Sequence, residues 1–111
     1  MEVRNSTNVE GLGLFTTKSY QAGVLVYTLS GKIYDYSMRE TIHIGGNKHI
    51  YDEYGIFINH SFTPNIRIDG LHVIALKDIN VGDELVFNYN DNEIDMANPF
   101  YVGDVLVSGK K

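Results

Sequence analysis

Short runs of β-branched and aromatic residues, separated by glycine-containing turns, dominate the pattern of hydrophobic and polar positions along this chain. Such runs are typical of β-strands, because these side chains pack well on a pleated surface. No segment shows four turns of helical periodicity, and no internal repeat or linker interrupts the pattern. The sequence therefore predicts a mostly β fold with little helix.

Several strands and turns can be placed from this pattern. Residues 24–29 form a predicted strand, and residues 32–36 begin another extended piece. The turn signal Asp69-Gly70 separates two apolar segments and predicts a hairpin over residues 65–76. Residues 37–48 lose any period, although Gly45-Gly46-Asn47 is typical of a hairpin tip or a flexible loop.

The final third of the chain contains a further predicted strand and a terminal cap. Residues 84–89 alternate with a period of two, which places Leu85, Phe87 and Tyr89 on one face. The tail is polar until residues 99–102, and it turns at Gly103-Asp104 into another apolar segment. We expect this tail to cover the rest of the protein rather than to fray.

Size and composition favour one globular domain over residues 1–111. Hydrophobic residues make up 43% of the chain and charged residues 21%, as in proteins that fold. No apolar run is long enough to span a bilayer, and the first five residues lack the apolar core of a signal peptide. The expected location is cytoplasmic or nuclear, in a host cell if the protein is viral, with no membrane contact.

Charge and cysteine content exclude several kinds of site. The chain has no cysteine, so disulfides and thiolate zinc sites are excluded, and the spacing of its four histidines predicts no metal site. The formal net charge of −5 argues against direct binding of nucleic acid and permits a basic peptide as partner.

The most informative stretch covers residues 51–65. Here Asn59-His60-Ser61 and Pro64-Asn65 follow the short apolar run at residues 55–58. Hydrogen-bonding side chains are costly to bury unless each finds a partner. Their crowding beside a buried segment therefore indicates a binding site, although polar turn residues taken alone describe an ordinary loop.

Three motifs in a fixed order carry a resemblance to a known family. They are Gly-Leu-Gly-Leu-Phe at residues 11–15, Asn-His-Ser-Phe-Thr-Pro-Asn at 59–65, and Gly-Asp-Glu-Leu-Val-Phe-Asn-Tyr at 82–89. Over residues 9–90 the chain resembles the SET-domain protein-lysine methyltransferases, and most closely the minimal viral or bacterial members that lack the cysteine-rich zinc segment. The resemblance implies several small antiparallel sheets with a knot-like threading of the carboxy-terminal part, residues 91–111 completing the site as a cap.

The resemblance also implies a reaction and its ligands. The cofactor would be S-adenosylmethionine, leaving as S-adenosylhomocysteine, and the substrate a lysine of a basic protein or peptide, such as a histone tail. That lysine would enter by a narrow channel from the face opposite the cofactor. The residues assigned to the cofactor are Glu10, Gly11, Leu12, Gly13, Asn59, His60 and Phe100.

Tyr89 occupies the position of the catalytic tyrosine of the family. Because its reference pKa is about 10, we assign it to orienting the amine rather than to acting as a strong base. The residues assigned to the substrate channel are Tyr27, Leu29, Ile68 and Phe87. At Phe87, a phenylalanine leaves space that a tyrosine hydroxyl would fill, so our hypothesis is that products reach di- or trimethyllysine.

The sequence departs from the family pattern at Leu29, Ile56 and Asn88, where many members carry tyrosine, arginine and an acidic residue, respectively. Simpler interpretations stand beside each assignment: the glycines as a hairpin turn, His60 as a core histidine, Tyr89 as a strand tyrosine and the phenylalanines as core. The acidic residues of segment 91–95 are either a solvated loop or an attraction for a basic peptide. For the whole protein, the alternative is a non-catalytic peptide-binding module with the same fold.

One expectation concerns assembly. The segment over residues 37–50 usually shapes substrate choice in the family, and it is short and irregular here. A groove left incomplete in one chain predicts a homodimer that completes it.

Overall fold

The computed structural model describes residues 1–110, in which short strands predominate. The strands are β1 (Glu2–Asn5), β2 (Leu12–Phe15), β3 (Leu25–Thr28), β4 (Lys32–Tyr34), β5 (Ile42–Gly45), β6 (Lys48–Tyr51), β7 (Asn59–His60), β8 (Ile66–Asp69), β9 (His72–Ala75), β10 (Val86–Phe87), β11 (Phe100–Val102) and β12 (Val105–Val107). A single 3-10 turn, η1 (Gly55–Phe57), precedes β7, and one short helix, α1 (Tyr89–Asn92), follows β10. Lys111, the last residue of the predicted cap, lies outside the described residues.

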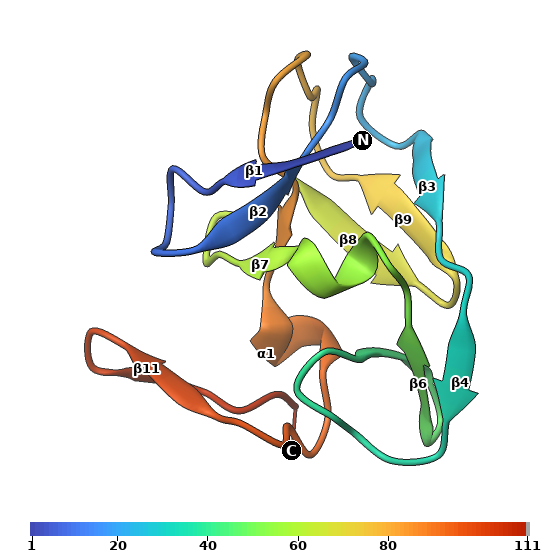
Figure 1. Ribbon diagram of the computed structural model, residues 1–111, viewed down its shortest axis with the longest axis vertical. Coiled ribbons are helices and arrows are strands. Elements are labelled where there is room, and N and C mark those ends of the chain that lie inside the picture. Colours follow the sequence, from blue (N-terminus) through green and yellow to red (C-terminus); the bar gives the residue numbers. More distant parts are fainter. Residues whose placement is uncertain (111) are drawn as a thin grey trace.

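The strands form five small sheets rather than one large sheet (Figure 1). Two sheets have three strands, in the orders β3-β9-β8 and β4-β6-β5, and the pairs β1-β2, β7-β10 and β11-β12 form the rest. Among the strands of residues 1–110, every pairing is antiparallel except that of β7 with β10, in which Val86 lies opposite Asn59 and Phe87 opposite His60. The prediction of a mostly β fold with several small antiparallel sheets is confirmed.

Turns that the sequence predicts from glycine lie where they were expected. Strands β8 and β9 pair from Ile66 opposite Ala75 to Asp69 opposite His72, and Gly70 in the turn has a φ of +60°. Such a positive φ is costly for residues with a Cβ, which explains the glycine. The segment without a sequence period is nevertheless ordered, since it contains β5 and its hairpin with β6. The hairpin tip predicted at Gly45-Gly46-Asn47 is therefore confirmed. The prediction of irregular structure is wrong for residues 42–45 and 48–50, because cross-strand pairing supplies the order that local periodicity does not indicate.

The main hydrophobic core lies among these sheets and not within any one of them. Its fully buried side chains come from β2, from the ends of β3 and β6, from the β8–β9 hairpin and from the segment before β10. They include Leu14, Leu29, Ile50, Ile66, Val73 and Leu85, each exposed by no more than 1%. No strand is long enough to bury this surface alone, so the small sheets depend on each other for stability.

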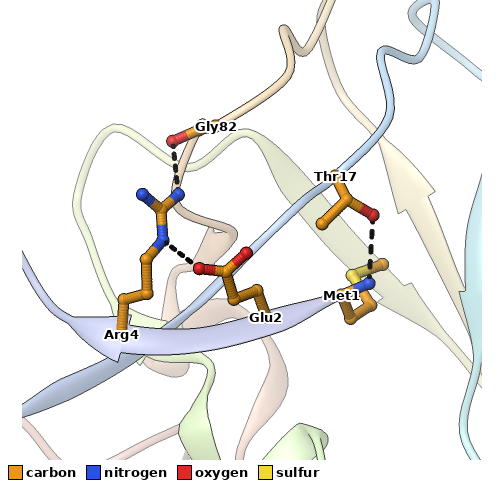
Figure 2. Close-up of polar contacts among 5 residues, drawn as sticks. All are labelled: Met1, Glu2, Arg4, Thr17 and Gly82. Atoms are coloured by element: carbon orange, nitrogen blue, oxygen red, sulfur yellow. Dashed lines mark hydrogen bonds and ion pairs between the residues drawn. The ribbon is translucent and has the colours of Figure 1, made fainter.

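Polar contacts fasten the amino-terminal strand β1 to neighbouring segments (Figure 2). The guanidinium of Arg4 donates to the backbone oxygen of Gly82, at 3.4 Å, and pairs with Glu2 at 3.3 Å. The same guanidinium lies 4.2 Å from the ring centroid of Phe15. These contacts hold β1, which the sequence pattern does not predict, against β2 and the loop before Glu84.

Strand β10 is shorter than the sequence predicts. The strand expected over residues 84–89 ends at Phe87, and Tyr89 begins α1. Asn88 has an extended backbone, and its side chain accepts a hydrogen bond from the backbone N–H of Asn90, so it caps the helix. The prediction that Tyr89 continues the strand is therefore wrong, since the strand ends two residues earlier, at Phe87, and Asn88 caps the helix that follows.

The carboxy-terminal hairpin β11–β12 projects from the rest of the molecule and is drawn in red in Figure 1. Its turn contains Gly103, which has a φ of +59° at the position predicted for the turn. At its base, the side chain of Asn90 donates to the backbone oxygen of Leu106 and accepts from the backbone N–H groups of Ser108 and Gly109. Helix α1 therefore anchors the hairpin through one amide side chain.

Candidate functional site

A large cleft of about 1030 Å³ opens between the hairpin β11–β12 and the segments around β7. Its walls come from the loop before Gly11, from residues 37–42, from η1 and β7, and from residues 96–102. Of the residues assigned to the site from sequence, those that line the cleft are Glu10, Asn59, His60, Phe87, Tyr89 and Phe100. The structure thus brings together residues that lie up to ninety positions apart.

A buried asparagine holds together the segments that carry β7 and β10. The side chain of Asn65 donates to the backbone oxygen of Glu84, at 2.8 Å, and accepts from the backbone N–H of Val86, at 2.9 Å. The backbone N–H of Asn65 also donates to the oxygen of Val86. Asn65 is 8% exposed, so these hydrogen bonds are shielded from water and hold the segment after β7 beside β10.

The amide of Asn59 has only one orientation that satisfies its neighbours. Its Nδ2 donates to the backbone oxygen of Leu12, at 2.8 Å, and to Oε2 of Glu84, at 2.9 Å. Both partners are acceptors, so the nitrogen must face them. Within residues 1–110, Oδ1 makes no hydrogen bond, which leaves an acceptor at the cleft.

His60 presents an unused donor. Its Nδ1 accepts from the backbone N–H of Tyr89 at 3.0 Å, which in the neutral ring places the proton on Nε2. Burial lowers the pKa of His60 below 6.5 and favours that neutral form. Nε2 is buried without a partner in the described residues. The His60 ring meets the rings of Phe62 and Phe100 in edge arrangements, at centroid distances of 4.5 and 5.9 Å.

Tyr89 lies at the inner end of the cleft. Its hydroxyl donates to the backbone oxygen of Ile58 at 2.6 Å, and its ring centroid is 4.8 Å from that of Phe87 and 5.2 Å from that of His60. Burial, followed by the charges of Glu93 and Glu84, raises the pKa of Tyr89 well above 10. The hydroxyl therefore remains protonated at neutral pH and can position a ligand but cannot remove a proton.

Phe100 closes the cleft from the opposite side. It lies on β11, and its ring centroid is 5.9 Å from that of His60 and 6.1 Å from that of Tyr89, both in edge arrangements. The side chain is 38% exposed, in contrast to the buried Phe87. An aromatic ring in this position offers a face against which a flat ligand can stack.

The other residues assigned from sequence do not line the cleft. Gly11 and Leu12 are exposed, and Gly13 is buried in β2. Tyr27 donates its hydroxyl to the buried carboxylate of Asp52, at 2.8 Å, and Leu29 is part of the hydrophobic core.

Ile68 borders a second, smaller hollow of about 80 Å³, together with Asn88 and Asp91. Phe87 lines both the cleft and this small hollow. The ring of Phe87 is therefore the one assigned side chain shared by the two depressions.

The family model described as "SET domain" matches residues 11–90. This chain belongs to the SET-domain family. That family comprises protein-lysine methyltransferases, and its members typically use S-adenosylmethionine. No curated protein sequence matches the chain at a significant level.

Two solved structures show the same fold as this SET domain. A Plasmodium falciparum protein, named as a candidate histone methyltransferase, matches with a TM-score of 0.63 and 21% identity, covering 79% of this chain and 94% of the other. A humanised mutant of the Chaetomium thermophilum Polycomb Repressive Complex 2, bound to the inhibitor GSK126, matches with a TM-score of 0.62 and 20% identity. That match covers 98% of this chain and 19% of the other.

Three buried carboxylates of this SET domain were not identified from its sequence. Glu84 and Asp52 are 7% and 1% exposed, and each accepts hydrogen bonds from several segments. Glu93 is 5% exposed and lines the cleft, so it does not belong to the solvated loop expected for residues 91–95. Burial raises the pKa of Glu93, although hydrogen bonds from His43 and Asn92 oppose the shift. Asp52 and Glu93 lie among turn and loop residues, and Glu84 lies in the motif at residues 82–89, where the pattern does not show that its carboxylate is buried.

The SET domain has neither an evident metal site nor a membrane-spanning helix among its described residues. Among residues 1–110, no group of three or more histidine, aspartate or glutamate side chains is arranged to hold a metal ion. Over the same residues, no helix has the length and hydrophobicity needed to cross a membrane.

Proposed function

We propose that this SET domain transfers methyl groups from S-adenosylmethionine to the side-chain amine of lysine in a basic protein or peptide. The observation that carries the proposal is the position of Phe87 and Tyr89: Phe87 borders both the cleft and the small hollow, and the Tyr89 ring packs against it. A cofactor in the cleft and a lysine entering through the small hollow would meet at these two rings.

The cleft has free groups that suit the cofactor. Oδ1 of Asn59 is an unbonded acceptor for an ammonium group. Nε2 of His60 is a buried donor without a partner, and leaving it unpaired costs about 1–3 kcal/mol. A ring nitrogen of adenine is an acceptor that would satisfy this donor, and Phe100 supplies a stacking surface beside it.

The bound cofactor supplies an electrophilic methyl group on a positively charged sulfur. The residues of the chain have to orient the amine, keep it unprotonated and exclude water. The Tyr89 hydroxyl is fixed by its hydrogen bond to the Ile58 oxygen, so its remaining lone pair can accept from the substrate amine. The apolar rings of Phe87 and Tyr89 exclude water and disfavour the charged form of the amine, which lowers the pKa of the lysine.

The mouth of the small hollow suits a basic peptide. Asp91, which is exposed, lines this hollow with Asn88 and Asn92. Arg67 also lines it, and its guanidinium is paired with Asp69 at 3.6 Å. One carboxylate at the entry attracts a cationic side chain before the chain of the lysine becomes desolvated. A histone tail is one substrate with this chemistry, and the proposal extends to any accessible lysine in a basic segment.

The test is a transfer assay with labelled S-adenosylmethionine and a mixture of basic proteins, histones included. We expect label on lysine, and a fall in kcat of about 100-fold for Tyr89→Phe, because a positioned hydrogen-bonding group is lost. Binding of S-adenosylhomocysteine to this variant should stay within a few-fold of the wild type. Tyr36→Phe, at a tyrosine that is 55% exposed, is the matched control.

Two outcomes would contradict the proposal. If Tyr89→Phe transfers methyl groups as fast as the wild type, the Tyr89 hydroxyl does not contribute to the reaction. Binding of S-adenosylhomocysteine without transfer to any lysine would favour the alternative, a non-catalytic peptide-binding module.

We propose further that the products extend to di- and trimethyllysine. Phe87 carries no hydroxyl that would occupy the space beside the amine. Mass spectrometry of the product should show di- or trimethylation in the wild type and a shift toward monomethylation in Phe87→Tyr. Monomethyllysine alone at full conversion in both proteins would overturn this part of the proposal.

A further inference from the structure

The carboxylate of Glu84 is buried behind the cleft without a positive partner. It is 7% exposed and accepts hydrogen bonds from Oγ of Ser6 at 2.6 Å, from Nδ2 of Asn8 at 3.0 Å and from Nδ2 of Asn59 at 2.9 Å. All three donors are neutral. In the described part of the chain, the ion pairs between side chains are Arg4 with Glu2 and Arg67 with Asp69, and neither involves Glu84.

Burying a carboxylate that has only neutral hydrogen-bond donors carries a large desolvation free energy, which its role in joining loops does not explain. Uncharged acceptors can bind the same donors with a smaller desolvation cost. The protein also keeps the space around the carboxylate clear, because a Cβ added at Gly13 would overlap Oε2 of Glu84. The negative charge itself therefore requires an explanation.

Two of the three donors connect Glu84 to the cleft. Asn8 and Asn59 both line it, whereas the carboxylate stands behind them. By accepting from Nδ2 of Asn59, Glu84 fixes the amide so that Oδ1 is the atom left free. Only the amide group of Asn59 therefore separates the negatively charged carboxylate of Glu84 from the unbonded Oδ1.

We propose that Glu84 is a positioning residue that makes the Asn59 side of the cleft selective for a cationic group, and that this group is the ammonium of the cofactor. The inference rests on the proposed function and deepens it by adding Glu84 as the residue that orients Asn59 toward this ammonium. Glu84 orients Asn59 so that Oδ1 accepts from the ammonium, and the ammonium supplies the positive partner that Glu84 lacks among the described residues. From Oε2 of Glu84, across the amide of Asn59, the ammonium nitrogen would be about 6–7 Å away.

The expected size of the effect follows from the distance. One opposite charge about 6–7 Å away, in a partly screened site, changes affinity by roughly 10- to 100-fold. The effect should depend on the ammonium and not on the adenosine part of the ligand. That dependence separates electrostatic positioning from a general structural role of Glu84.

The experiment measures ligand binding by calorimetry, independently of turnover. The three ligands are S-adenosylhomocysteine, its analogue without the amino group, and 5′-methylthioadenosine, which lacks the whole amino-acid part. In the wild type, removing the amino group should weaken binding by at least about 10-fold. In Glu84→Gln this difference should shrink to less than about 3-fold, while binding of 5′-methylthioadenosine stays unchanged.

Glu53→Gln is the matched control, because it makes the same change in net charge at an exposed glutamate. It should keep the wild-type difference between the ligands. If Glu84→Gln does not fold, the same measurements use Glu84→Asp, whose shorter side chain withdraws the carboxylate from Asn59. The ligand difference should then also fall.

The outcomes distinguish this inference from the proposed function. Failure of the wild type to bind any of the three ligands would overturn the proposed function, and the inference with it. Equal binding of S-adenosylhomocysteine and its amino-free analogue by the wild type would overturn the inference alone. A folded Glu84→Gln or Glu84→Asp protein that keeps the full wild-type difference would reduce Glu84 to a structural residue.

Discussion

The two sides of the cleft are held in different ways. The core wall, formed by β7, β10 and Asn65, is fixed by hydrogen bonds that are buried. The hairpin wall, formed by β11 and backed by its partner β12, has side chains exposed by 38% at Phe100 and 69% at Tyr101. The base of this hairpin is tied to α1 largely through Asn90. An isolated two-stranded hairpin is marginally stable in water.

The difference separates two tasks within one site. The core wall holds Asn59, His60 and Tyr89 in place before any ligand arrives, so their positions cost nothing at binding. The hairpin wall has few buried contacts and belongs to the parts of a protein that open most easily. We therefore expect substitutions in the core wall to alter global stability and substitutions at the hairpin base to alter local opening.

The largest effect is expected for Asn65→Ala. This change removes a buried donor and a buried acceptor and leaves the Glu84 oxygen and the Val86 N–H without partners. The free energy of unfolding should fall by about 2–4 kcal/mol. Urea denaturation measures it, with Asn47→Ala at the exposed tip of the β5–β6 hairpin as control, where about 0.5 kcal/mol or less is expected. A loss below about 1 kcal/mol for Asn65→Ala would contradict the description of the core wall.

The next effect is local. Asn90→Ala removes three hydrogen bonds that tie the end of β12 to α1. Hydrogen exchange of the amides in β11 and β12 should accelerate by about 10-fold or more, while the amides of β8 and β9 keep their protection. Asn98→Ala is the control, because Asn98 is exposed and its side chain makes no hydrogen bond within residues 1–110. Equal acceleration throughout the protein would show that the two walls unfold together.

A smaller effect concerns pH and the buried histidines, which lie outside the hairpin wall. Burial, followed by the charge of His43, lowers the pKa of His49 below 6.5. The imidazole of His49 therefore binds a proton more readily in the unfolded chain than in the folded protein. Its contribution to the free energy of unfolding is fully present above pH 6.5, where His49 is neutral in both states. It is lost as the pH falls through the lowered folded value.

His49→Phe should remove this part of the pH dependence. Between pH 8 and pH 5.5 the wild type should lose up to about 1 kcal/mol more stability than the variant. His60 shifts in the same direction and is present in both proteins, so its contribution cancels. Thermal unfolding across this range measures the difference, and the exposed His72, changed to Gln, is the control. If stability falls equally with pH in the wild type and in His49→Phe, His49 is not the source of this pH dependence.

The smallest effect tests the hairpin wall from within. Tyr101→Ala should change the free energy of unfolding by about 0.5 kcal/mol or less, because the side chain is largely exposed. Val107→Ala, on the same hairpin but fully buried, should cost about 1–2 kcal/mol. A large cost for Tyr101→Ala would show that the hairpin packs more tightly than its exposure indicates.

The sequence predicted those parts of the fold that depend on local chemistry. The turns at Gly70 and Gly103 and the hairpin tip after Gly45 follow from residues that favour a turn wherever they stand. The family motifs likewise identified Asn59, His60 and Tyr89, which the structure brings to one cleft. The assignments of Tyr27 and Leu29 to the substrate channel stay predictions, since neither residue borders the cleft or the small hollow.

Only the tertiary structure decided where polar side chains find their partners. Glu84 accepts from Ser6 and Asn8, which lie 78 and 76 residues earlier, and Asn65 bonds residues 19 and 21 positions away. Local propensity contains no information about such pairings. The sequence around a carboxylate or an amide side chain is the same whether that side chain is solvated or is buried against a distant segment. The sequence by itself therefore determined the family, the strand-rich fold and the catalytic candidates. The packing of distant segments decided that Glu84 is buried, that β10 ends at Phe87, and that the cleft has one rigid wall and one exposed wall.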